Sequence, residues 1–599
     1  MGDMSTCRLD QRAHLANEGY EDTFRWLLLS REGGGGGSTA RNLETSLASL
    51  YESMEEKIKA TNYIFNMARR TERLATIAQH PSALGALARV LREEGRKSFN
   101  LRLNIVSIFF LMSFFPKFHQ CLLEQKIGKT TLNILVLEVQ CMETRMQLEE
   151  TAATPARLNS ENTTTASEIS LMFQNTKQEK LLYMCISLLL NIAEDLNVEK
   201  RMKKCNLVEF LCKILVRKSI ALLIITVTFL KKLSIFKQNM DVMKENGIIY
   251  RLSVLIPCQH ESLLLAVLRL LWNLSFDPGL RMDMIKCKVI QALEMLLKDK
   301  KFEHLVFGLL YNLSIDAEGR KAFLETDIGP MILQAMTVES RQNITGELVA
   351  LAVNLTTLPH TSEIICRSQG LERFLQRAIQ FRNPLLFKVI KNISKSETAK
   401  PQLLRFLPAL IDVIKRPDSC TFLQVEVMKI FNQVATLGDV FYRLVEDTDL
   451  LQFLMKSSLM EEEEIFLEIV VFVGAVGSDR IAVKIADSGL VRRMCTYFLQ
   501  KKRDSEIVLQ LLWTLGQLLL NASTSKEVVA CDKAVVSILE LSRDPNKAVA
   551  RLAEVLVNTI VEFDAQWCVK LKWLKFASYN KERYALSEDS MDRVSTRTS

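Results

Sequence analysis

The sequence predicts an all-α protein built as a solenoid of short helical repeats, and three observations support this. The 599 residues include only 22 glycines and 12 prolines, too few for the many strand reversals of an all-β protein. Hydrophobic residues make up 48% and charged residues 24%, a balance that supplies a core and excludes global disorder. One phrase, an apolar run followed by Asn, an apolar residue and a small residue, recurs about every 40 residues.

The Asn position of this phrase recurs along the chain, and we call each such position a register mark. Some marks carry another residue in place of Asn. Their spacing falls in the period of armadillo and HEAT repeats, whose units stack side by side. The marks are Asn191, Lys232, Asn273, Asn312, Asn354, Asn392, Asn432, Gly474, Gln517 and Asn558.

The repeat after the mark at Asn273 shows three predicted helices. The Pro278-Gly279 pair ends the preceding helix, because Pro cannot continue it and Gly accepts a left-handed cap. A short helix then runs through Met284, a second covers Val289–Leu297, and a third covers Phe302–Ile315. Glycines that permit a sharp turn recur before the second helix, at Gly247, Gly329, Gly370 and Gly489. Three helices per repeat favour an armadillo-repeat superhelical solenoid over two-helix HEAT repeats.

Composition changes outside the periodic region predict the domain boundaries. We expect the solenoid over residues 43–576, preceded by a flexible arm over 1–42 that contains the run Gly33–Gly37. Residues 150–168, rich in Thr, Ala, Asn and Glu, are expected to form an exposed insertion. The gap before Asn191 is about two periods, so this region replaces or expands a repeat. Residues 577–599 are expected to be a disordered tail.

Cysteine usage and hydropathy indicate a cytoplasmic protein. The 13 cysteines lie far apart with no Cys-x-x-Cys, which disfavours a disulfide or zinc framework. Nothing resembles a secretory signal, and the apolar stretches Ile105–Phe115 and Ile220–Leu230 are shorter than the roughly 20 residues of a membrane span, so both predict buried helices. The net charge of +8 is small for this length and suggests an acidic partner surface rather than nucleic acid.

Several phrases of the chain resemble the kinesin-associated protein family, the non-motor subunits of heterotrimeric kinesin-II. The resemblance covers roughly residues 45–576, and it includes linker residues such as Asp277-Pro278-Gly279-Leu280-Arg281. Two features depart from the family: the arm carries a Gly run, and the tail is short, so functions of a long C-terminal extension are not carried over. The phrases lie in Leu188–Asp195, Phe229–Phe236, Leu268–Arg281, Phe307–Asp316, Phe381–Ser394 and Asn558–Trp567.

The resemblance implies a non-catalytic adaptor that needs no cofactor. It would bind the C-terminal tails of two kinesin-II motor subunits and link them to cargo or transport-particle proteins, including those of intraflagellar transport. The implied location is the cytoplasm and cytoskeleton, including the cilium or flagellum. Nucleic acid is not an expected partner, and contact with membranes would be indirect or through acylation.

The amides at the marks have two interpretations. An Asn side chain can bind both C=O and N–H of an extended peptide that crosses the third helices, which makes these residues a candidate partner-binding groove. Alternatively, the amides brace neighbouring helices. The candidate amides are Asn191, Asn273, Asn312, Asn354, Asn392, Asn432 and Asn558.

Basic residues share the face of the marks and predict an acidic partner. Arg269 and Lys388 lie one helical turn before a mark, while Lys232 replaces the amide itself. They could equally be solvated charges without a partner. The pair Trp513 and Gln517 alone keeps the Trp–Asn-like spacing by which nuclear-import armadillo proteins bind cargo lysines, so that function is poorly supported.

Signatures of catalysis and of metal binding fail on inspection. Gly128-Lys129-Thr130 matches the end of a phosphate loop, but Leu123 stands where the first glycine must be. The six histidines are scattered without the other ligands of a metal site. The acidic run Glu461–Glu464 predicts a solvated helix start, favoured by the positive end of the helix dipole.

The N-terminus supplies an alternative function. Met1-Gly2-Asp3-Met4-Ser5-Thr6 fits the N-myristoylation pattern at Gly2, with Cys7 as a second acylation candidate. An acylated chain would be a membrane-associated armadillo scaffold without a motor partner. One acyl chain gives only marginal membrane binding, so Cys7 or basic residues would have to assist.

Overall fold

The computed structural model describes most of the predicted solenoid. The expected arm at residues 1–42, with Gly2 and Cys7, lies outside the described residues, as do 153–164 of the insertion and 581–599 of the tail. The chain divides into two compact units, Met1–Ala322 (unit 1) and Phe323–Ser599 (unit 2), and each is described by itself. The described residues are 43–152, 165–193, 206–337, 344–367, 370–438, 441–442, 445, 450–459, 462–475, 479–577 and 580.

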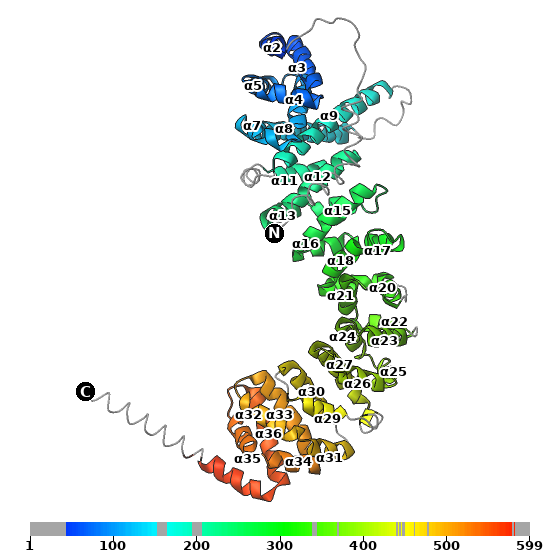
Figure 1. Cartoon of the computed structure of the whole chain (residues 1–599), viewed down its shortest axis with the longest axis vertical. Helices are drawn as coiled ribbons and strands as arrows, with labels where there is room; N and C mark the ends of the chain where they lie inside the picture. The colour runs from blue at the N-terminus through cyan, green and yellow to red at the C-terminus, as the bar shows by residue number, and fades with distance from the viewer. Residues whose placement is uncertain are drawn as a thin grey trace, which may run out of the picture. The chain divides into compact units, whose positions relative to one another are not determined.

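All regular elements among the described residues of unit 1 are helices, and they follow one another in repeats (Figure 1). The first part of the unit contains α2 (Leu43–Ala48), η1 (Ser49–Tyr51), α3 (Met54–Ala68), α4 (Thr71–Gln79), α5 (Ala83–Glu94), α6 (Phe99–Ser113), η2 (Pro116–Phe118), α7 (His119–Glu124), α8 (Ile127–Ala152) and α9 (Thr165–Ile192). The second part contains α11 (Leu207–Ile214), α12 (Ile220–Leu233), α13 (Lys237–Glu245), α14 (Ile248–Ser253), α15 (Glu261–Leu274), α16 (Pro278–Lys286), α17 (Val289–Lys298), α18 (Glu303–Ser314) and α19 (Ala317–Ala322).

Unit 2 continues the pattern of short first, medium second and long third helices. Its elements are η4 (Phe323–Glu325), α20 (Ile328–Thr337), α21 (Gly346–Leu355), α22 (Pro359–Arg367), α23 (Gly370–Phe381), α24 (Pro384–Ile393), α25 (Lys400–Leu404), α26 (Leu407–Lys415), α27 (Thr421–Val434), η5 (Ala435–Leu437), α29 (Leu450–Ser457), α30 (Glu463–Ala475), α31 (Asp479–Ser488), α32 (Leu490–Gln500), α33 (Ser505–Leu519), α34 (Ala522–Val529), α35 (Asp532–Leu541) and α36 (Lys547–Phe563).

The third helices stack directly on one another and form the core of each unit. In unit 1, α3 packs on α6, α6 on α9, α9 on α12, α12 on α15, and α15 on α18. In unit 2 the same row runs from α21 through α24, α27, α30 and α33 to α36. Since each third helix is covered by neighbours on both sides, it is apolar around most of its circumference. Leu264, Leu268 and Leu271 of α15, for example, are almost completely buried.

The region before Asn191, where two register marks lie about two periods apart, is one expanded repeat. Its second helix, α8, has 26 residues and its third helix, α9, has 28 residues. The two helices pack on each other, and α9 also packs on α6 and α12, so it takes the place of a single third helix in the stack. The ends of both helices extend into the predicted insertion, because residues 150–152 belong to α8 and 165–168 to α9.

The turn before the second helix is left-handed in several repeats, but glycine is not required there. Gly247 and Gly489 adopt positive φ, as expected. The same turn is made by Lys126, Asn206 and Lys288, which directly precede α8, α11 and α17. The expectation was wrong for the other two glycines, Gly329 and Gly370, because they lie within the first turn of α20 and α23.

The turn at Asp277 is also different from the predicted one. Gly279 is not a left-handed cap, because it lies in the first turn of α16 behind Pro278 at the first helical position. Asp277 is the N-cap, and its Oδ1 accepts a hydrogen bond from the backbone N–H of Leu280 at 2.9 Å. The residue pair therefore begins the next helix, since Pro is preorganised for that position.

The two long apolar stretches are core helices, as predicted. Ile105–Phe115 lies mostly in α6 and Ile220–Leu230 in α12, and most of their apolar side chains are buried. Among the described residues, no single helix has the length and hydropathy to cross a membrane. The bent pair Phe99–Ser113 and Pro116–Glu124 reaches those values only when its two helices are taken together.

Candidate functional site

The predicted amides of unit 1 form a hydrogen-bonded ladder between third helices. Asn191 Nδ2 donates to Ser113 Oγ at 3.0 Å, and Asn273 Nδ2 donates to Ser234 Oγ at 3.0 Å. Asn312 Nδ2 donates to Ser275 Oγ at 2.7 Å. Each bond runs from one repeat to the end of the preceding third helix, so these amides brace the stack.

The acceptors of this ladder are the small residues of the repeat phrase, whose role the sequence reasoning missed. Ser113, Ser234 and Ser275 each donate their own hydroxyl proton to a backbone carbonyl three residues earlier, at 2.7 Å. Their oxygens are thereby oriented to accept from the next repeat. The recurring Ser two residues after the mark was the signal that could have revealed this pairing.

Lys232 performs the same bracing with a cation. Its Nζ donates to the backbone carbonyl of Ala193, at the end of α9, at 2.8 Å. An ammonium group has three donors and no acceptor, so it can replace only the donor half of the amide. Lys232 therefore continues the ladder between α9 and α12, where the phrase lacks Asn.

The amides of unit 2 are arranged less regularly. Asn392 Nδ2 donates to the Val353 carbonyl at 2.9 Å and to Thr356 Oγ1 at 3.4 Å, toward the preceding repeat as in unit 1. Asn432 donates in the other direction, to Glu468 Oε2 of the following repeat at 2.8 Å. Asn354 lies half-buried in α21, while Asn558 is exposed on α36. The seven amides are thus not one uniform set.

Beside the ladder, three consecutive third helices of unit 1 carry a row of side chains that are half-buried or exposed. These positions fall four residues before, one before and three after each mark, which places them on one helical face. We call this row the open stripe. It consists of Thr228, Lys231 and Ile235 on and after α12, Arg269, Trp272 and Phe276 on and after α15, and Tyr311 and Ile315 on and after α18.

The open stripe ends in exposed apolar side chains on all three repeats. Ile235 is 73% exposed, Phe276 is 62% exposed and Ile315 is 45% exposed. Exposed single apolar residues are common, but three at the same register position of successive repeats form a continuous row. The sequence reasoning missed this row, although the residue after each Ser of the phrase is its signal.

Trp272 lies in the middle of the open stripe and packs against the next repeat. A Cβ atom at Gly308 of α18 would overlap the Trp272 ring, so the absence of a side chain there makes room for the indole. Trp513 makes a similar contact with Gly474 in unit 2, and it is 41% exposed, with Gln517 half-buried beside it. Both tryptophans therefore pack across repeats.

The cations of the open stripe stand close to each other. Burial lowers the pKa of Lys231, and the positive charge of Arg269 lowers it further. An anion placed beside these two cations would relieve the repulsion between them. In unit 2, burial lowers the pKa of Lys391, against the opposing effect of Glu426, and Lys388 contributes to the lowering.

The acidic run of unit 2 begins a helix, as predicted, but it is also paired. Glu463 and Glu464 lie in the first turn of α30, whereas Glu461 is outside the described residues. Glu463 pairs with Lys501 at 2.8 Å, and Glu464 pairs with Lys429 at 3.1 Å. These ion pairs link α30 to its neighbouring repeats.

The described residues include the sequence that resembles the end of a phosphate loop. Gly128, Lys129 and Thr130 lie in the first turn of α8, in a helix rather than a phosphate loop. Among the described residues, no cluster of His, Cys, Asp and Glu has the arrangement to hold a metal ion. Gly2 and Cys7, the acylation candidates, are outside the part of the chain that the structure describes.

Similar solved structures confirm the armadillo fold class. One comes from a study of a phosphorylation switch that controls the interaction between cadherin and beta-catenin. It has a TM-score of 0.63 and 13% sequence identity, and the match covers 88% of this chain and all of that one. An engineered protein matches with a TM-score of 0.54 and 16% identity over 64% of this chain and 95% of its own.

The sequence also matches the family described as kinesin-associated protein, over residues 37–596. This interval contains the amide ladder, the open stripe and nearly the whole stack of third helices in both units. The chain belongs to the kinesin-associated protein family.

Proposed function

We propose that this chain is the non-catalytic adaptor subunit of a heterotrimeric kinesin-II motor. It binds the C-terminal tails of two motor subunits and links them to cargo or transport particles, including those of intraflagellar transport in the cilium or flagellum. Membership of the kinesin-associated protein family supports the kinesin partner. No chemistry at a single residue is needed, because a stack of repeats binds through its extended surface.

The open stripe of unit 1 is the proposed surface for a motor tail, and its row of exposed apolar ends is the observation that carries this assignment. Ile235, Phe276 and Ile315 offer apolar contacts on three successive repeats. Lys231 and Arg269 lie one turn away and favour acidic residues in the same partner. An apolar row beside cations suits a segment that carries both apolar and acidic side chains.

The amide ladder contributes indirectly in this proposal. Each Asn of the ladder donates from its Nδ2 to the preceding repeat, and its carbonyl oxygen is an acceptor besides. The ladder therefore holds the third helices in register. Asn273 Nδ2 donates to both Ser234 Oγ and the Lys231 carbonyl, so what Asn273 offers a peptide backbone is its carbonyl oxygen as an acceptor. The remaining predicted groove residues, Lys388, Trp513, Gln517 and Asn558, lie in unit 2 and are secondary candidates.

A binding experiment with purified tails tests the function and the surface separately. Full-length chain should co-purify with the tails of two kinesin-II motor subunits in equal amounts and show no ATPase activity alone. Binding of neither tail would refute the adaptor function. Replacing Phe276 and Ile315 by Glu should weaken tail binding about tenfold or more, because buried apolar contacts at an interface centre dominate affinity.

A matched variant controls for surface charge. Val254 and Met295 are 71% and 55% exposed in the same unit but lie outside the open stripe. Their joint replacement by Glu should leave tail binding unchanged. If both variants lost tail binding equally and their melting temperatures were unchanged, the open stripe would be excluded as the binding surface. The adaptor function itself would remain supported by tail binding of the unaltered chain.

A further inference from the structure

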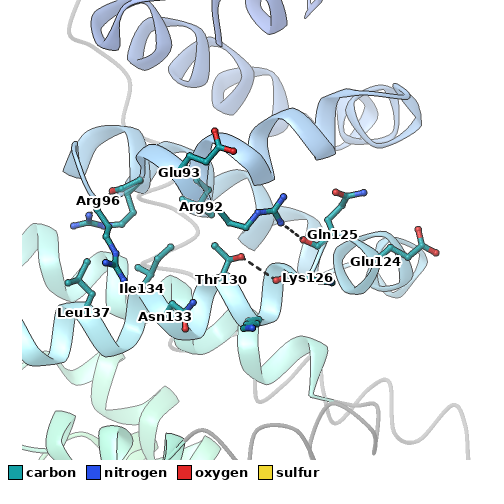
Figure 2. A pocket seen from close by; sticks show the side chains of 14 residues that line it. Arg92, Glu93, Arg96, Glu124, Gln125, Lys126, Thr130, Asn133, Ile134 and Leu137 are labelled. Atoms are coloured by element: carbon teal, nitrogen blue, oxygen red, sulfur yellow. Dashed lines mark hydrogen bonds between the residues drawn. The ribbon is translucent and has the colours of Figure 1, made fainter. Parts of the chain in front are cut away.

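A cavity of about 750 Å³ lies in unit 1 between the end of α5, the start of α6 and the first turns of α8 (Figure 2). It lies away from the open stripe, and neither the adaptor function nor the amide ladder uses it. Its size falls within the range of small-molecule sites. The Gly128-Lys129-Thr130 sequence, which fails as a phosphate loop, contributes Lys129 and Thr130 to the lining.

Positive charge dominates the lining. Arg92 and Arg96 come from α5 and the turn after it, and Lys126 and Lys129 come from the start of α8. All four side chains are exposed at the cavity, and two carboxylates, Glu93 and Glu124, oppose them. Arg102 also lines the cavity, but its charge is compensated by a buried ion pair with Glu138. The four remaining cations exceed the carboxylates by two.

The cations are held on a preorganised frame. Arg92 Nη1 donates to the Gln125 carbonyl at 3.0 Å, which ties α5 to the end of α7, and Figure 2 shows its side chain directed toward Gln125. Arg102 Nη1 donates to the Gly95 carbonyl at 2.8 Å and so fixes the turn that carries Arg96. Arg96 lies at the other end of the cavity, beside Ile134 and Leu137 (Figure 2).

The start of α8 adds to this positive field. The helix has 26 residues and begins at Ile127, and Lys129 and Thr130 of its first turn line the cavity, so the positive end of its dipole lies beside it. The first intrahelical acceptor is the Lys126 carbonyl, which receives the Thr130 N–H at 3.2 Å. The helix dipole and the side-chain cations therefore add to the same positive field at the cavity.

The shape of this charge identifies the ligand class. Cations at both ends of one cavity suit several anionic groups on a compact frame better than a single phosphate. None of the described residues that line the cavity is aromatic, so none of them would stack on a nucleobase. We propose that this cavity binds a polyphosphorylated polyol, an inositol polyphosphate, either free or as the headgroup of a phosphoinositide.

Calorimetric titration of the full chain with inositol hexakisphosphate at physiological salt tests this site. Saturable binding with one ligand per chain is expected. Replacing Arg96 and Lys129 together by Glu should weaken it by about tenfold or more, since both ends of the cavity lose a cation. The conservative pair Arg96→Lys and Lys129→Arg should retain binding to within about threefold, because charge is kept.

A matched charge reversal distinguishes the cavity from general attraction to a basic protein. Lys286 and Lys288 are exposed in the same unit, and their replacement by Glu changes net charge equally. This variant should bind normally. Equal weakening in both reversals, absence of binding to the unaltered chain, or equally tight binding of ATP would each overturn the proposal. If the reversal at the cavity lowers the melting temperature, Lys129→Gln alone replaces it, with an expected loss of about threefold.

Two sources of the ligand are separated by a vesicle assay. Flotation with neutral phosphatidylcholine vesicles, with and without a phosphoinositide, is compared with the soluble titration. Flotation that depends on the phosphoinositide and on Arg96 and Lys129 supports the headgroup as ligand. Soluble binding without flotation supports a free inositol polyphosphate. Kinesin-tail binding should be the same in the cavity variants and the unaltered chain.

Discussion

The third helices of the two units share a repeat phrase but use it differently. In unit 1, Asn191, Asn273 and Asn312 all donate backward to a Ser hydroxyl, and the open stripe beside them is apolar and basic. In unit 2, Asn432 donates forward to Glu468, and Lys429 pairs with Glu464. The phrase therefore sets the stacking of helices, whereas the residues around it set the chemistry of the exposed surface.

This difference matters for recognition because it decides which charges are available. Cations in unit 1 stand beside each other, and the pKa of Lys231 is lowered in part by Arg269. In unit 2, Lys429 lies within 3.1 Å of Glu464 and 3.5 Å of Glu426, so the charges neutralise one another. In the proposed complex, an acidic segment would gain more from unit 1, since the open stripe itself contains cations and no carboxylate.

The largest expected effect concerns glycines in third helices of the two units. Gly308→Ala in unit 1 should destabilise the chain by about 2 kcal/mol, because the new Cβ overlaps the Trp272 ring. Gly516→Ala in unit 2 meets only an ordinary contact with Leu556, and its better helix propensity should stabilise by up to about 1 kcal/mol. Urea denaturation followed by circular dichroism measures both.

Changes of opposite sign in the free energy of unfolding of these two variants would support the difference between the units. If Gly308→Ala left the free energy of unfolding unchanged, the position of the Trp272 ring would not depend on the missing side chain at Gly308. Gly308 would then not explain how Trp272 packs on the next repeat. Tryptophan fluorescence of the same variant reports whether the ring has moved.

An intermediate effect is expected for the amides. Asn312 is 5% exposed and bonds Ser275, so Asn312→Ala should cost about 1–2 kcal/mol through the lost hydrogen bond and the buried hydroxyl left behind. Asn432→Ala should cost less, about 0.5 kcal/mol, because the Oδ1 atom of Asn432 is buried without a partner and its removal offsets part of the loss. Melting temperatures and urea midpoints of the two variants test the order. A larger loss for Asn432→Ala would contradict the view that the regular ladder of unit 1 is the stronger brace.

The smallest effect is a pH dependence in unit 2. Burial raises the pKa of Glu468 above that of an unfolded Glu, and nearby Glu464 and Glu426 add to the rise against Lys429 and Asn432. A raised carboxyl pKa favours folding when the group is protonated, so this contribution is lost as pH rises from the unfolded pKa through the folded one. Glu468→Gln should therefore be more stable than the unaltered chain at neutral pH, by about 0.5 kcal/mol after screening by solvent.

The pH profile of that variant provides its own control. Its advantage should shrink as pH falls toward the usual range of Glu, where both chains carry a neutral group. Glu318→Gln, at a carboxylate of unit 1 that is 58% exposed, should show no comparable trend. An advantage of Glu468→Gln that is independent of pH would mean that packing, and not charge, explains it.

Much of the fold follows from periodicity alone. The phrase recurs at the end of each third helix because every repeat must present the same apolar face to its neighbours. For this reason the helices expected at Val289–Leu297 and Phe302–Ile315 were confirmed as α17 and α18 to within about a residue. The apolar stretches Ile105–Phe115 and Ile220–Leu230 were correctly expected to be core.

Only the tertiary structure decided what those repeated residues touch. An Asn at a mark can bond either a peptide or the neighbouring repeat. The sequence does not distinguish the two, because the partner of Asn312, Ser275, lies 37 positions away in the chain. The sequence predicted Gly279 as a helix cap, but in the structure Asp277 caps α16 and Gly279 lies in its first turn. The cavity likewise assembles Arg92 and Arg96 with Lys129 from elements far apart in the chain. Local pattern determines which residues form each helix, but contacts between helices depend on how the repeats stack.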